Sequence, residues 1–337
     1  MGSMARPFTR AFLLTVAVQL ILVLNQNLAL ASEGDTHPQF IQCNVRCQSD
    51  CALEESTGAE PQWRTWDLWL TGWTCRENCR YKCMQEDVAL RELEKRPTVK
   101  YYGKWPFRRV LGLQELFSSL FSVANFVPHF QYFFIWRKVA PATYFMKPLW
   151  TAYACSAMWT WFWSAAFHAR DTVLTERMDY FGATMSLMFM LFLSIVRVAR
   201  ITDRRRWVML GIPFVLYFIG HCLYLHFIHF HYGYNMTFSI IIAVAYLASF
   251  TAWAFVNRKR PYMWKLIIAN TIILIFAFFE VFDFPPVWSL IDAHAVWHAA
   301  TPIAAYLTWS FLLDDATYSS YDLSSTIRRG NKYYDQE

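Results

Sequence analysis

Long apolar segments alternate with short polar ones from about residue 110 to residue 313. Each segment is about 20 residues long, and 20 helical residues rise about 30 Å, enough to cross the hydrocarbon core of a bilayer. The pattern therefore predicts an all-α fold, a polytopic bundle of seven transmembrane helices. The expected helices are Val110–Trp136, Lys147–Phe167, Asp179–Ala199, Trp207–Leu225, Met236–Val256, Met263–Phe284 and Ala293–Leu313.

The N-terminus has the pattern of a secretory signal. Arg6 and Arg10 precede a short apolar stretch, 11–24, which is followed by the small residues of Ala29-Leu30-Ala31. This order predicts a cleaved signal peptide over residues 1–31. The alternative is an uncleaved first helix, which the short apolar stretch disfavours. After cleavage, the mature chain begins in the lumen.

Six of the eight cysteines fall in an expected lumenal domain, residues 32–108, here called the Cys-rich domain. They form two rows with a spacing of four: Cys43, Cys47 and Cys51, then Cys75, Cys79 and Cys83. Residues four apart share one helix face, so the rows predict two antiparallel helices joined by disulfides. Of fifteen connectivities, geometry favours the nested pairs Cys43–Cys83, Cys47–Cys79 and Cys51–Cys75. The rival is a thiolate metal site, which an oxidising lumen disfavours.

Four tryptophans recur at nearly helical spacing inside this domain: Trp63, Trp66, Trp69 and Trp73. One interpretation is a face packed against the two disulfide-bonded helices. The other is a row of indoles at the membrane interface or against a lipid headgroup.

Composition and charge support a membrane protein with a defined orientation. The chain is 56% hydrophobic, 19% aromatic and only 17% charged, which lies outside the usual globular range. Basic residues gather in three loops, at 137–138, 200–206 and 257–260, and in the polar tail, 314–337. The positive-inside rule places these loops in the cytosol. We thus expect a lumenal N-terminus, a seven-helix transmembrane domain over 109–313 and a loosely ordered cytosolic tail.

Five polar residues on three expected helices come to the same membrane depth. Ser164 and His168 end the second helix, Asp179 opens the third, and His294 and His298 open the seventh. Ionisable residues at such depth indicate a functional site. Histidines at i and i+4 share a helix face, and a third from another helix completes the three-nitrogen set of catalytic zinc. A single intramembrane histidine is more often a packing residue, but three at matched depth favour a metal site.

Other polar residues are given structural interpretations. The histidines at the lumenal end of the fourth helix favour an interfacial belt. They are His221, His226, His229 and His231. Glu280 and Asp283 either orient metal ligands or cap polar contacts. Asp171 and Glu176 are expected to pair with Arg170 or Arg177. Asn235 matches the glycosylation pattern but lies too close to a helix start for modification.

Three segments resemble a known group. They are WSAAFHARD at 163–171, TERMDYF at 175–181 and DAHAVWH at 292–298. Together with the two cysteine rows, they resemble the signature of the post-GPI-attachment-to-proteins lipid-remodelling family of the CREST hydrolase superfamily. That superfamily includes alkaline ceramidases and adiponectin receptors, and the resemblance covers essentially the whole mature chain.

The resemblance implies a phospholipase A2-type enzyme that removes the sn-2 acyl chain from the inositol phospholipid of GPI-anchored proteins. It implies Zn²⁺ ligands at His168, His294 and His298, with Ser164 and Asp179 as their polar partners. Our hypothesis for the mechanism makes Asp179 the proton carrier and Ser164 a hydrogen-bond donor to the oxyanion, in preference to a nucleophilic Ser164. The implied location is the Golgi or endoplasmic reticulum membrane, with no retrieval signal at the C-terminus and no nucleic-acid partner. The alternatives are a ceramidase-like amidase and a non-enzymatic seven-helix receptor or GPI-protein escort.

Overall fold

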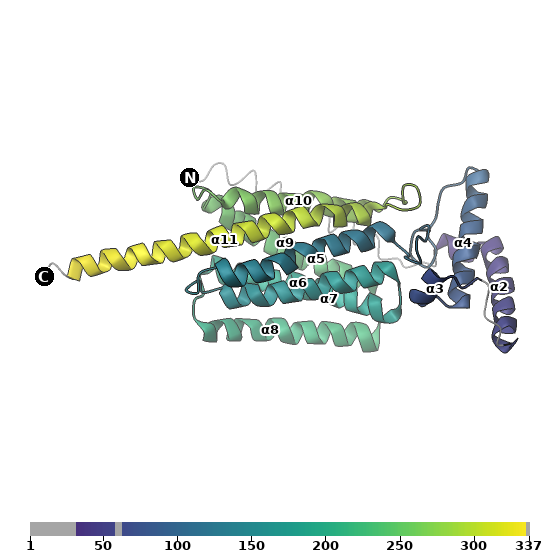
Figure 1. Ribbon diagram of the computed structural model, residues 1–337, viewed down its shortest axis with the longest axis horizontal. Helices are drawn as coiled ribbons and strands as arrows, with labels where there is room; N and C mark the ends of the chain where they lie inside the picture. Colours follow the sequence, from purple (N-terminus) through teal and green to yellow (C-terminus); the bar gives the residue numbers. More distant parts are fainter. Residues whose placement is uncertain (1–31, 58–62, 335–337) are drawn as a thin grey trace.

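A computed structural model describes residues 32–57 and 63–334 of the chain. The expected signal peptide, 1–31, lies outside the described residues. Within them the secondary structure is helical, with isolated β-bridges and no strand, which confirms the all-α fold. A helix bundle forms most of the molecule, and the Cys-rich domain lies at one end of it (Figure 1).

The Cys-rich domain contains one short 3₁₀ helix and three α-helices. Their bounds are η1 (Glu33–Thr36), α2 (Pro38–Thr57), α3 (Trp66–Leu70) and α4 (Cys75–Leu93). The bundle contains seven long helices and one π-helical turn. Their bounds are α5 (Leu116–Val139), α6 (Lys147–Ala169), α7 (Val173–Val198), α8 (Arg204–Leu223), η2 (Tyr224–Ile228), α9 (Tyr232–Val256), α10 (Met263–Phe282) and α11 (Ala293–Tyr334).

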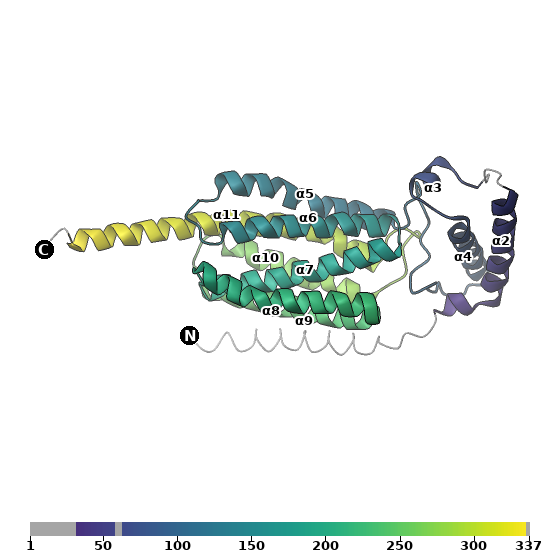
Figure 2. The same cartoon turned by 90° about the horizontal axis from the view of Figure 1, so that it is seen from below.

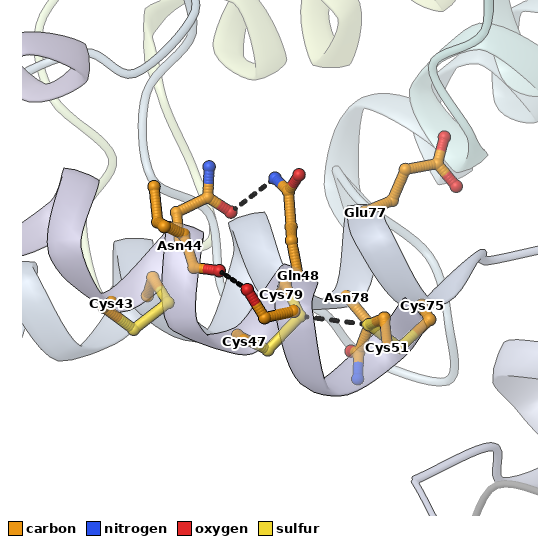
Figure 3. The surroundings of a disulfide bond; sticks show 12 residues. Cys43, Asn44, Cys47, Gln48, Cys51, Cys75, Glu77, Asn78 and Cys79 are labelled. Carbon is orange, nitrogen blue, oxygen red and sulfur yellow. Dashed lines mark hydrogen bonds between the residues drawn. A yellow bond between two sulfur atoms is a disulfide. The ribbon is translucent and has the colours of Figure 1, made fainter. Parts of the chain in front are cut away.

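Three disulfides join α2 to α4 along facing sides of the two helices (Figure 3). The pairs are Cys43–Cys83, Cys47–Cys79 and Cys51–Cys75, with Cα–Cα distances of 5.6, 5.6 and 5.8 Å. This is the nested order that the spacing favours, since residues four apart stack on one helix face. All six sulfurs are consumed in these bonds, so no thiolate is left for a metal ion here.

The tryptophans of the Cys-rich domain do not share one environment. Trp66 and Trp69 on α3 are 69% and 63% exposed, so the packed-face interpretation is wrong for both. Trp73 is buried, and its indole N–H donates to the carbonyl of Gly112 at 2.8 Å. Gly112 has φ +74°, and a Cβ there would lie 2.6 Å from the carbonyl oxygen of Asp67. Only glycine permits this close approach between α3 and the segment before α5.

Six helices of the bundle form a closed ring in the order α5, α6, α7, α9, α10 and α11, with α11 again beside α5. Helix α8 lies outside this ring and packs on α7, as Figures 1 and 2 both show. The end of the bundle farther from the Cys-rich domain is held by fully buried indoles. They are Trp136, Trp150 and Trp309.

Three of these helices are long and apolar enough to cross a membrane by length and composition: α7, α8 with its π turn, and α9. Helix α10 has a shorter apolar stretch, Met263–Phe279. Seven bundle helices are observed, but seven membrane spans remain a prediction. Two of the expected helix bounds are wrong. Helix α5 begins at Leu116 rather than at Val110, and α11 does not end where expected. That helix continues to Tyr334, past the expected end at Leu313, and extends beyond the bundle (Figure 2).

Candidate metal and catalytic site

The imidazoles of His168, His294 and His298 converge at the end of the bundle that faces the Cys-rich domain. Nε2 of His294 lies 3.3 Å from Nε2 of His168 and 2.7 Å from Nε2 of His298. One ligand atom from each ring lies within 4.8 Å of the other two. His168 comes from the last turn of α6 and the other two from the first turns of α11, as the motif spacing predicts.

The geometry suits a tetrahedral cation with nitrogen ligands. Zinc–nitrogen bonds of about 2.0–2.1 Å imply tetrahedral nitrogen–nitrogen separations of about 3.3 Å. The His168–His294 separation equals this value, and the His294–His298 separation is shorter. A single Nε2–H of His294 can serve only one of its two neighbouring nitrogens at full strength, whereas a cation accepts the lone pairs of all three rings. The three histidines therefore form a group that can hold a metal ion.

Glu115 fixes the orientation of His168. Its carboxylate oxygen lies 2.6 Å from Nδ1 of His168, so Nδ1–H donates to Glu115 and the Nε2 lone pair points into the cluster. The backbone sets this contact: the N–H groups of Gln114 and Glu115 donate to the carbonyls of Ala169 and His168. The segment before α5 thereby caps the end of α6, which brings Glu115 beside the ring.

His298 is held by the side of α5 that faces α11. Ser122 Oγ donates to the carbonyl of Ser118 at 2.7 Å and lies 3.4 Å from Nδ1 of His298. The single serine hydrogen is thus used, so Ser122 accepts from Nδ1–H and the Nε2 lone pair of His298 faces the cluster. Pro302 lacks an N–H, which frees the His298 carbonyl four residues earlier, and Asn125 donates to that carbonyl at 2.9 Å.

Ser164 and Asp179 lie beside the histidines. Ser164 is buried, its hydroxyl lies 3.1 Å from Ser122 Oγ, and it interacts electrostatically with the carboxylate of Asp179. Asp179 occupies the second turn of α7 rather than its first residue, because Thr172 and Thr175 form a capping box that starts the helix at Val173. All five residues expected at this site are therefore in one place, on α6, α7 and α11.

The neighbouring acidic residues make contacts that differ from those expected. Asp171 pairs with Lys104 at 2.8 Å rather than with an arginine, since Arg170 is taken by Glu77 at 2.5 Å. Asp283 accepts from Lys100 and from the indole N–H of Trp105, so it joins the Cys-rich domain to α10 and orients no histidine. The side chain of Glu280 lies outside the described residues.

The interfacial-belt interpretation is wrong for His221 and stays a prediction for the three exposed histidines near α8. His221 is buried, its Nε2 lies 3.0 Å from Oδ1 of Asn235, and it is a satisfied packing residue. His231 caps α9 by accepting from the N–H of Tyr234 at 3.0 Å, while His226 and His229 are exposed. Asn235 is 5% exposed, so this fold shields it from glycosylation, in agreement with the expectation.

Glu115, Ser122 and Asn125 were not predicted from the sequence. A signal was present, because polar residues recur at a spacing of three or four from the N-cap residue of α5 along this apolar helix. They are Glu115, Ser118, Ser122, Asn125 and His129. Such a spacing places them on one face, and a polar face on an otherwise apolar helix indicates contact with other polar groups.

Several known proteins are similar to this chain over most of its length. A zebrafish (Danio rerio) protein named GPI-specific phospholipase A2-like PGAP3 is 36% identical over 295 residues, 86% of this chain and 92% of the relative. The human protein of the same name is 33% identical over 309 residues, 90% of this chain and 95% of the relative. The Schizosaccharomyces pombe protein PER1 homolog is 35% identical over 323 residues, 93% of this chain and 94% of the relative. No solved structure matches the chain.

The family model of the Per1-like family matches residues 65–316, a range that starts at α3 and contains all five predicted site residues. The match spans well over half of the chain, and relatives above 30% identity align with nearly all of it. This chain therefore belongs to the Per1-like family.

Proposed function

We propose that this protein is a zinc-dependent membrane hydrolase that removes the sn-2 acyl chain from the inositol phospholipid of GPI-anchored proteins. The observation that carries the proposal is the convergence of three imidazole Nε2 atoms, two of which are oriented by Glu115 and Ser122. The relatives named GPI-specific phospholipase A2-like PGAP3 suggest the substrate class.

The residues of the site divide the work of ester hydrolysis. His168, His294 and His298 would hold Zn²⁺, which lowers the pKa of water and polarises an ester carbonyl when bound. Asp179 is placed to take a proton from the attacking water and to give it to the leaving lyso-lipid oxygen. Ser164 is placed to donate a hydrogen bond to the developing oxyanion, a contribution of about 3 kcal/mol in comparable sites. The carboxylate of Asp179 interacts electrostatically with Ser164, His168 and His294, which supports a shared role at one reacting centre.

We place the site at the lumenal side of a Golgi or endoplasmic reticulum membrane, with seven spans and a cytosolic C-terminus. Two features support this orientation. The histidine cluster lies at the end of the bundle that faces the Cys-rich domain with its three disulfides. Disulfides form and persist in an oxidising compartment such as the lumen. The basic loops at 137–138, 200–206 and 257–260 lie at the opposite helix ends.

Two variants test the assignment in purified full-length protein, with zinc content from elemental analysis and lyso-GPI production as readouts. His294→Ala should lose zinc and activity together, whereas His229→Ala, an exposed histidine, should lose neither. Asp179→Asn should keep zinc and lose activity by about 10²-fold or more. Normal turnover in Asp179→Asn would refute its catalytic role, and full zinc occupancy in His294→Ala would refute the ligand set. Zinc binding without any lipid turnover would favour a receptor or escort.

A further inference from the structure

A cavity of about 200 Å³ lies where the Cys-rich domain meets the bundle. Its walls come from three parts of the chain that are distant in sequence. Helix α4 supplies Arg80, the segment 101–114 supplies Lys104 and Arg109, and the residue after α6 is Arg170. Tyr102 and Trp105 provide flat aromatic walls. Gln114, Arg170 and Asp171 therefore complete a wall that otherwise comes mainly from the Cys-rich domain.

The charged groups of this cavity do not balance. Four basic and two acidic residues line it, and each carboxylate already has a cation: Glu77 holds Arg170 at 2.5 Å, and Asp171 holds Lys104 at 2.8 Å. Within the part of the chain that the structure describes, Arg109 has no carboxylate within salt-bridge distance. Its one side-chain hydrogen bond there is from Nη1 to Oδ1 of Asn78, at 3.2 Å.

Aromatic rings hold the Arg109 guanidinium in place. Its central carbon lies 3.6 Å from the ring centroid of Trp73 and 3.9 Å from that of Tyr81. The guanidinium of Arg170 also lies over Trp73, at 3.9 Å, so two cations share one indole. Stacking fixes the plane of Arg109 but leaves its N–H groups to other partners.

Three guanidinium nitrogens at this place are buried without a hydrogen-bond partner among the described residues: Nε and Nη2 of Arg109 and Nε of Arg170. Burial lowers the pKa of Arg109 to about 10, which shows how poorly the surroundings compensate its charge. A buried cation with unused donors costs stability unless an anion with several acceptor oxygens completes the site. Here the unpaired donors of the two arginines lie at the wall of a cavity, and perturbed charged groups beside a cavity are typical of a binding site.

The cavity is next to the histidine cluster. Lys104, which lines the cavity, lies 3.2 Å from one oxygen of Glu115, and the other oxygen of Glu115 lies 2.6 Å from Nδ1 of His168. One lysine and one carboxylate thus separate the cavity wall from a proposed zinc ligand. In a glycerophospholipid, the phosphate and the sn-2 ester are also separated by only a few covalent bonds.

We propose that this cavity binds the phosphodiester of an inositol phospholipid headgroup, with Arg109 as the principal contact and with Arg80 and Lys104 at its rim. The inference rests on the proposed function and specifies how the substrate is held there. Phosphate oxygens match the planar donor arrangement of a guanidinium. Binding at this point anchors the headgroup and leaves the acyl ester to reach Ser164 and the histidines.

The test is direct binding of soluble glycerophosphoinositol to purified full-length protein, measured by calorimetry, with inorganic phosphate as the comparison ligand. Arg109→Gln should weaken glycerophosphoinositol binding by about tenfold or more. The matched control is Arg108→Gln, because Arg108 is exposed, adjacent in sequence and absent from the cavity wall, and it should bind as the wild type does. Arg80→Gln, an exposed rim residue, provides a second variant that should weaken binding without disturbing the fold.

The binding measurement is repeated in the His294→Ala background, where zinc and lipid hydrolysis are expected to be lost. Unchanged binding in that background would show that headgroup binding does not depend on the zinc site. Failure of the headgroup inference and failure of the proposed hydrolase activity can then be told apart. Equal affinity of the wild type for inorganic phosphate and glycerophosphoinositol would overturn the headgroup assignment. Wild-type affinity in both Arg109→Gln and Arg80→Gln would overturn the site itself.

Discussion

One oxygen of Glu115 lies 2.6 Å from Nδ1 of His168, and the other lies 3.2 Å from Nζ of Lys104. The carboxylate therefore connects the histidine cluster to a cation from the Cys-rich domain. Burial alone would lower the pKa of Lys104, but Glu115 and Asp171 outweigh burial and raise it above its ordinary value. The lysine stays charged, and the carboxylate stays ionised to accept the hydrogen of His168.

Loss of the Glu115 charge should weaken zinc binding. In Glu115→Gln we expect the zinc affinity to fall by about 10–100-fold, because the amide orients His168 but no longer raises the basicity of its ring. Competition with a chromophoric chelator measures this affinity. Glu92→Gln, an exposed residue at the end of α4, serves as the control and should bind zinc normally. Equal affinities in Glu115→Gln and the wild type would show that the carboxylate has no role in the metal site.

The five predicted site residues could be found from the sequence because their spacing and their positions near helix ends indicate where their side chains lie. Ser164 and His168, like His294 and His298, share a helix face at i and i+4, and all lie at helix ends. The contact between Glu115 and His168 could not be predicted in this way, because the two residues are 53 positions apart in the sequence. The polar spacing along α5 marks Glu115 as a residue that faces other polar groups, but its partner depends on how the segment before α5 caps α6.

Hydrophobic patterning predicted the seven bundle helices but not their arrangement. It gave no indication that α8 lies outside the ring or that α11 continues to Tyr334. Residues 314–334 look like a polar tail because their composition is polar, yet helix formation needs no apolar stretch once α11 is nucleated. The nested disulfides were predictable, because two rows of cysteines spaced by four admit one antiparallel pairing without strain.

Removal of the Ser164 hydroxyl should slow the reaction rather than weaken substrate binding. We expect Ser164→Ala to lower kcat by about 10²–10³-fold with little change in KM and with normal zinc content, as for loss of one oxyanion donor. Steady-state kinetics on a GPI lipid substrate measure both constants. The control is Ser156→Ala on the same helix, where the hydroxyl faces Ser186 at 3.5 Å instead of the histidines. A raised KM with an unchanged kcat would contradict the oxyanion role.

The buried ion pair between Arg197 and Asp315 should stabilise the far end of the bundle. Two bonds, of 2.8 and 2.7 Å, join the side chains, and the hydroxyls of Tyr144 and Tyr262 each lie 3.0 Å from the carboxylate. Asp315→Asn should cost about 3–5 kcal/mol, because it leaves a buried guanidinium without its counter-charge. Unfolding in mixed micelles, followed by tryptophan fluorescence, measures the free energy.

The control for this pair is an exposed one. Arg206 lies 3.8 Å from Asp203, and both side chains are more than half exposed, so Arg206→Gln should cause no measurable loss of stability. Equal effects of Asp315→Asn and Arg206→Gln would show that burial of the Arg197 pair has no energetic consequence.

The stability of the Cys-rich domain should depend on pH through Asp87. This carboxylate is buried, lies 2.5 Å from Nδ1 of His37 and 3.1 Å from Nε of Arg91, and accepts from the hydroxyl of Tyr101. Burial alone would raise the pKa of Asp87, but these hydrogen bonds outweigh burial and lower it below its ordinary value of 3.8. A lowered pKa means that the folded state favours the ionised carboxylate more than the unfolded chain does.

The stabilisation from Asp87 is therefore complete above the unfolded pKa and is lost as the pH falls through that value towards the folded one. Asp87→Asn should melt at a lower temperature than the wild type at pH 7, and the difference should shrink below about pH 4. Melting of the full-length protein, followed by circular dichroism between pH 7 and pH 3, measures this difference. Asp50→Asn on α2, where the side chain is exposed, should show no such dependence. A difference that stays constant over this range would show that the Asp87 hydrogen bonds do not favour its ionised form.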